Sequence, residues 1–153
     1  MRLASSRACV IALAAAVCCT PLMASAPDLA KVRIGHFRKL GAAYKTVSDA
    51  LRHGDVHSDS VRQALQQIED AANNLGSWFP PGSGPQPGVK TSAKPEIWTD
   101  ANEFRAAREA FASQNAALQR VAPDGDAAAI RTEVLKLGAT CKACHDKFRV
   151  PED

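Results

Sequence analysis

The chain of 153 residues carries 19 Lys plus Arg against 16 Asp plus Glu, which gives a formal net charge of +3. Because Arg2 and Arg7 belong to a predicted export signal, the remainder is close to neutral and lacks the basic excess of proteins that bind nucleic acid or anionic membranes. The length suits a single core, and few aromatic residues with no strand-like alternation predict an all-α fold.

The first segment of the chain has the composition of a secretory signal peptide. Two arginines are followed by an apolar run at 8–17 and by Ala-Ser-Ala at 24–26. The apolar run is too short to cross a bilayer, although a retained membrane anchor is the alternative. We therefore expect residues 1–26 to be removed and residues 27–153 to form one periplasmic domain that does not associate with a membrane.

Two amphipathic helices are predicted in the first half of this domain, over 28–53 and 59–75. Their apolar residues recur at spacings of three and four, which places them on one face of an α-helix. Gly54 and Gly76 follow the two helices, where glycine commonly ends a helix. The apolar positions are Phe37, Leu40, Tyr44, Val47 and Leu51 in the first helix and Val61, Leu65, Ile68, Ala72 and Leu75 in the second.

A long irregular segment follows at 78–95. Its prolines and glycines prevent a helix from continuing through it. We expect a crossover between the second and third helices, with a binding loop as the alternative. The helix-breaking residues are Pro80, Pro81, Gly82, Gly84, Pro85, Pro87, Gly88 and Pro95.

Two more helices are predicted after this connection. The third begins near Asp100, where Glu103 is placed to complete a capping box. After a turn at 123–126, Asp126 is a suitable N-cap for the fourth helix. The resulting fold is an antiparallel four-helix bundle. The apolar stripes are Phe104, Ala107, Phe111, Leu118 and Val121 in the third helix and Ile130, Val134, Leu137, Cys141, Cys144 and Phe148 in the fourth.

The fourth helix contains the sequence Cys-Lys-Ala-Cys-His at 141–145. Cys141 and Cys144 lie one helical turn apart, so each thiol can form a thioether with a haem vinyl group, and His145 can then bind the iron. The motif therefore predicts one covalent haem c with His145 as metal ligand. A redox dithiol and half of a zinc site are the alternatives, but the first normally opens a helix in a βαβ unit and the second needs further paired ligands.

The placement of this motif near the end of a bundle's last helix resembles the class II cytochromes c, meaning cytochrome c′ and its six-coordinate relatives. The similarity covers essentially all of 27–153. It is carried by Arg-Ile-Gly-His-Phe-Arg-Lys-Leu-Gly at 33–41, Lys-Pro-Glu-Ile-Trp-Thr-Asp at 94–100 and Gly-Ala-Thr-Cys-Lys-Ala-Cys-His-Asp-Lys-Phe-Arg at 138–149. The resemblance implies His145 as proximal ligand, Arg149 near the proximal face, and a possible homodimer through the first two helices.

The low-spin, methionine-ligated members of the family are the nearest alternative to cytochrome c′. The chain differs from them at the residue that supplies the sixth iron ligand. Their methionine aligns here with Phe37, and the only methionines are Met1 and Met23, both in the predicted signal. We therefore expect a five-coordinate iron with an apolar distal side. Such a site disfavours oxygen but admits small ligands such as NO and CO.

Several alternatives remain at the sequence level. His36 could supply a sixth ligand, which would make the protein a low-spin electron carrier. Arg33, on the same helix face as Phe37, could bind a haem propionate or be a surface arginine. A peroxidase-like enzyme would need an acid/base residue above the iron, which the apolar stripe does not offer, so no enzyme is expected. Redox proteins and gaseous ligands are the expected partners.

Overall fold

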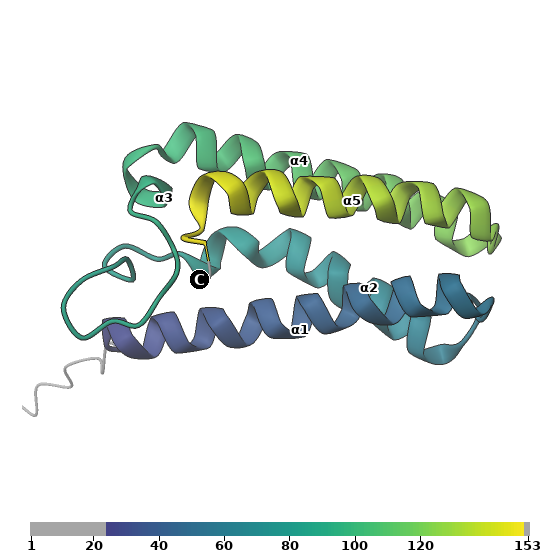
Figure 1. Ribbon diagram of the computed structural model, residues 1–153, viewed down its shortest axis with the longest axis horizontal. Coiled ribbons are helices and arrows are strands. Elements are labelled where there is room, and N and C mark those ends of the chain that lie inside the picture. The colour runs from purple at the N-terminus through teal and green to yellow at the C-terminus, as the bar shows by residue number, and fades with distance from the viewer. Residues whose placement is uncertain (1–23, 152–153) are drawn as a thin grey trace, which may run out of the picture.

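The computed structural model describes residues 24–151, so nearly all of the predicted export signal lies outside the described residues. Within that range the long helices form an antiparallel four-helix bundle, which confirms the predicted fold (Figure 1). None of its helices is long and apolar enough to cross a membrane. The helices are α1 (Ala26–His53), α2 (Asp59–Asn74), the short α3 (Glu96–Thr99), α4 (Ala101–Val121) and α5 (Ala127–Phe148).

Two predicted helix ends are confirmed in atomic detail. Gly54 ends α1 in the left-handed conformation, with φ 83°, and donates its N–H to the carbonyl of Ala50 at 2.8 Å. The side chain of Asp126 accepts a hydrogen bond from the N–H of Ala128 at 2.9 Å and so caps α5. These contacts set the two turns that lie together at one end of the bundle (Figure 1).

The predicted capping box at Asp100 and Glu103 is wrong. The short helix α3 precedes α4, and the N–H of Asp100 donates to the carbonyl of Glu96 at 2.8 Å. Asp100 therefore lacks the extended backbone of an N-cap, and its side chain caps nothing. Glu103 instead forms an ion pair with Lys147 of α5.

The end of α2 also differs from the prediction. The α-helix stops at Asn74, and the chain tightens into a 3₁₀-helix over Leu75–Trp78 that contains Gly76. A Cβ at Gly76 would lie 2.2 Å from Nη1 of Arg108, so a larger residue here would displace the end of that side chain. Gly76 does not end the helix with a left-handed turn.

The tightest core lies toward the end of the bundle where the two short turns meet. Its most buried side chains come from all four long helices, which lie in Figure 1 as an α1–α2 pair and an α4–α5 pair. Over their whole length, α1 and α5 make far fewer contacts with each other than α1 makes with α2 or α4 with α5. The largest fully buried apolar residues are Val47, Val61, Ile68, Leu118, Ile130 and Leu137.

Arg33 anchors the long connection to α1. Its side chain is only 2 % exposed, and it donates to Oγ of Ser83 at 2.9 Å, to the Ser83 carbonyl at 3.0 Å and to Oγ1 of Thr91 at 3.0 Å. The guanidinium also lies over the rings of Phe79 and Trp98, at 4.9 and 5.5 Å. Arg33 is therefore a buried cation, and its interpretation as a surface arginine is wrong.

The connection is also joined to the end of α5. An isolated antiparallel bridge pairs Ala93 with Arg149. Around it, the N–H of Lys94 donates to the carbonyl of Phe148 at 2.9 Å, and the N–H of Val150 donates to that of Ser92 at 2.8 Å. The connection thus crosses from α1 to α5 and closes this end of the bundle, as expected of a crossover (Figure 1).

We predict that Arg33→Gln lowers the free energy of unfolding by about 2–3 kcal/mol, because hydrogen bonds to a buried charged group are lost and their acceptors remain buried. Arg62→Gln is the matched control. Arg62 contacts Asp59 at the surface, so its removal should cost less than about 0.5 kcal/mol. Urea denaturation measures both values, and equal effects would contradict the anchoring role.

Candidate functional site

A cavity of about 1200 Å³ lies at the end of the bundle that carries the connection. It exceeds the roughly 300–1000 Å³ of ordinary small-molecule sites. Its exposed lining residues include Arg38 of α1 and Leu135 and Lys142 of α5, so the cavity opens to solvent between these two helices. Aromatic rings supply much of its wall: Phe37, Phe79, Phe104, Phe111 and Phe148.

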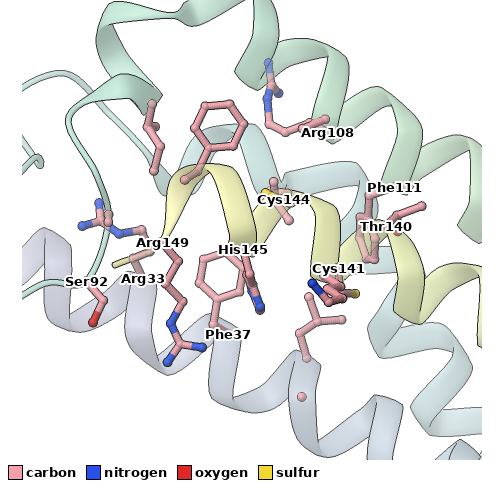
Figure 2. A pocket seen from close by; sticks show the side chains of 18 of the residues that line it. Arg33, Phe37, Ser92, Arg108, Phe111, Thr140, Cys141, Cys144, His145 and Arg149 are labelled. Carbon is pink, nitrogen blue, oxygen red and sulfur yellow. The ribbon is translucent and has the colours of Figure 1, made fainter. Parts of the chain in front are cut away.

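The motif at 141–145 faces this cavity. Cys141, Cys144 and His145 all line it, and both thiols are half-buried against the core (Figure 2). They occupy the last turns of α5, where the stripe of Ile130, Val134 and Leu137 has brought the helix against its neighbours. One turn of helix therefore presents two thiols and an imidazole to a single large space.

The electrostatics of the motif do not favour a redox dithiol. Burial raises the pKa of Cys141, and burial together with the neighbouring Cys141 thiol raises the pKa of Cys144 to about 11. Neither thiol lies at a helix N-terminus, where a thiolate would be stabilised. Partial desolvation, and then the charge of Arg149, lowers the pKa of His145, which keeps the imidazole neutral and able to bind a metal.

The remaining histidines are not arranged around these cysteines as a zinc site would require. His36 stacks on Trp78, with ring centroids 4.8 Å apart and planes 11° apart. His57 lies against Gly125 at the opposite end of the bundle. Among residues 24–151, no three His, Cys, Asp or Glu side chains gather where they could hold a metal ion.

Phe37 lines the cavity from α1, whereas the adjacent His36 does not. The Phe37 ring meets Trp78 edge to face, with centroids 5.1 Å apart, and Phe79 at 5.9 Å. These contacts fix the ring at the cavity wall. The structure therefore separates two consecutive residues of α1, with a benzyl group in the cavity and an imidazole outside it.

Arg33 and Arg149 both line the cavity. No carboxylate of the described residues is in ion-pair contact with Arg33. Burial lowers the pKa of its guanidinium. Arg108 of α4 also lines the cavity, and its Nε is buried without a hydrogen-bond partner. These cations suit an anionic ligand inside the bundle.

Sequence reasoning missed Arg108, Phe111 and Lys90 as lining residues. The first two could have been found, because Arg108 interrupts the stripe of α4 between Phe104 and Phe111 and so places a cation on an inward face. Lys90 could not, since its position depends on the fold of the connection. The set as a whole fits haem c, with thiols for the vinyl groups, an imidazole for the iron, an apolar wall for the ring and cations for the propionates.

Comparisons with known proteins agree with this assignment. A family model described as Cytochrome C' matches residues 28–149. A cytochrome c′ from Rhodocyclus tenuis is 34% identical over 128 residues, which cover 82% of this chain and 96% of the relative.

Solved structures show the same fold. A cytochrome c′ from Thermochromatium tepidum superposes with a TM-score of 0.75 at 28% identity, covering 84% of this chain and 98% of that one. A cytochrome c′ described as having a ligand-controlled dimer dissociation gives a TM-score of 0.73 at 25% identity, with 84% and 99% covered. A nitric oxide complex of a mutant cytochrome c′ from Alcaligenes xylosoxidans gives 0.69 at 25% identity, with 85% and 99% covered.

Each of these relatives is named as a cytochrome c′, in agreement with the expectation of a haem protein. The family match spans all four long helices and the motif at 141–145. The chain belongs to the cytochrome c′ family, whose members carry a covalently attached haem c.

Proposed function

We propose that this protein is a periplasmic c-type cytochrome with a five-coordinate, histidine-ligated iron that binds NO or CO and transfers electrons. One observation carries the proposal. The cavity that contains the motif at 141–145 is lined from α1 by Phe37, which has no lone pair to give to iron, while His36 lies outside the lining.

The residues of α5 hold the cofactor in this proposal. Cys141 and Cys144 would hold the haem through two thioether bonds, in each of which the thiol's sulfur bonds to one vinyl carbon and its hydrogen to the other. His145, the next residue, would bind the iron through an imidazole nitrogen. The haem supplies an iron that can bind a diatomic ligand or change oxidation state. Arg33 and Arg108 supply positive charge for the propionates.

The distal face is apolar. Phe37 offers no hydrogen-bond donor to stabilise bound oxygen, and its ring narrows the space left for any ligand. Unlike oxygen, NO and CO need no such donor to bind iron, and a relative from Alcaligenes xylosoxidans has been described as a nitric oxide complex. NO and CO are therefore the ligands that this lining suits best.

The alternative electron carrier with His36 as sixth ligand requires a rearrangement. The imidazole would have to leave its stacked position on Trp78 and turn about 100° around α1 to replace Phe37. Electron transfer itself needs no sixth ligand. We therefore assign it to the same five-coordinate haem.

The domain boundary and location are part of the proposal. Cleavage after Ala26 would release the domain one residue into α1, which begins at Ala26. Residues 27–153 contain no cysteine other than Cys141 and Cys144, so no structural disulfide competes with haem attachment in an oxidising compartment. A homodimer through α1 and α2 is supported by the exposed Val32 and by the relative described with a ligand-controlled dimer.

Reduced protein produced with a cytochrome c maturation system should show a high-spin ferrous spectrum and take up NO. Optical and resonance Raman spectra before and after NO addition measure this. His36→Ala should leave the spin state unchanged, because His36 lies outside the cavity lining. A low-spin wild-type spectrum that becomes high-spin in this variant would overturn the proposal in favour of His36 ligation.

The thioether assignment predicts the behaviour of two variants. The double variant Cys141→Ser and Cys144→Ser should carry no haem through a denaturing gel, because hydroxyl groups do not form the vinyl linkage. Cys144→Ser alone should retain one covalent bond and a shifted pyridine haemochrome band. Covalent haem in the double variant would contradict the assignment.

Phe37→Ala should raise the association rate of CO with the ferrous protein by about tenfold, which corresponds to about 1.4 kcal/mol less barrier. The reason is removal of a ring that Trp78 and Phe79 hold at the cavity wall. Flash photolysis measures the rate. An unchanged rate, with the spin state preserved, would show that Phe37 does not limit access to the iron.

A further inference from the structure

The residues that line the cavity have a marked excess of positive charge. The described lining residues include no Asp or Glu, although acidic residues nearly balance basic ones in the chain after the predicted signal. The excess is therefore a property of this site and not of the composition. The basic lining residues are Arg33, Arg38, Lys90, Arg108, Lys142 and Arg149.

These cations form an inner and an outer set. Arg33 is buried and Arg108 is half-buried, so both face the interior where the propionates are proposed to lie. The outer four, Arg38, Lys90, Lys142 and Arg149, are exposed, and we call them the basic rim. The positive charges of Arg33 and Arg108 would offset the negative charges of the two haem propionates. The charge of the basic rim would then exceed what the haem requires.

The fold builds the rim from three separate segments. Arg38 comes from α1, Lys90 from the connection, and the other two from α5 and its end. The bridge between Ala93 and Arg149 and the hydrogen bond from Arg33 to Thr91 hold the connection beside both helices. The rim therefore depends on the same contacts that close the cavity.

Local acidic residues reduce the rim's charge only in part. Lys142 pairs with Asp146 across one turn of α5, at 2.5 Å, so its contribution is weakened. Arg38 and Lys90 form none of the ion pairs found among residues 24–151. Leu135, at the mouth of the cavity, is 66 % exposed. An apolar side chain beside a polar, charged rim is the usual composition of a protein interface.

We propose that the basic rim is the docking surface for the acidic face of a one-electron redox protein, an inference that rests on the proposed haem site. Docking there would bring the partner to the open side of the cavity that is proposed to hold the haem. One electron passes between the two proteins, so one is oxidised and the other is reduced, with no bond made or broken. Opposite charges across the interface orient the encounter and raise its rate.

The test uses the haem-loaded protein and a purified acidic flavodoxin as electron donor. Stopped-flow reduction of the ferric protein should slow several-fold between about 10 mM and about 200 mM salt, because screening weakens the attraction. Lys90→Glu and Arg38→Glu should each slow it by about three- to tenfold at low salt. Arg62→Glu changes the net charge equally but lies on α2 away from the cavity, and it should change the rate by less than about twofold.

Equal effects of Lys90→Glu and Arg62→Glu would overturn the inference, because the rate would then follow net charge alone. A rate that is independent of salt would also overturn it. Binding of the protein to phosphatidylglycerol vesicles that is lost in Lys90→Glu, without an effect on electron transfer, would assign the rim to a membrane. Each of these results would overturn only the docking inference, because the protein could still carry haem and bind NO. Failure to attach haem would instead remove the proposed function.

Discussion

The arrangement of the cavity depends on one buried guanidinium. Arg33 lies on α1 among neutral acceptors and aromatic rings, and its donors are satisfied by Ser83 and Thr91 of the connection. A cation in this position is costly unless its hydrogen bonds are satisfied, so the connection must stay in place. From there it reaches α5 through Ala93, and it can then close the end of the bundle.

The two ends of the bundle differ in packing: one is a filled core and the other holds the cavity. Near the two short turns, aliphatic side chains such as Leu118 and Val61 are fully buried and pack the four helices together. Near the connection, aromatic rings replace them and line the wall of the cavity without filling it. Stability generated at the first end allows the second end to hold an open space, because the helices are continuous through both.

Local patterns in the sequence predicted the elements with local causes. Helix periodicity placed the four long helices, and Gly54 and Asp126 ended or began them as expected, because these effects act within one turn. The motif at 141–145 could be recognised for the same reason, because its residues lie within about one turn of helix. The failure at Asp100 has the opposite origin, since α3 and the contact of Glu103 with Lys147 depend on how α4 meets the rest of the fold.

The rotation of α1 about its axis decides whether His36 or Phe37 reaches the cavity. The sequence alone did not decide between these two residues. Successive residues on a helix point about 100° apart, so a face that presents Phe37 to the cavity must turn His36 away. Trp78 then reinforces this choice, because it stacks on the imidazole and meets the phenyl ring edge to face. A single tryptophan from outside the cavity thus stabilises both side chains in the arrangement that keeps the imidazole of His36 out of the cavity.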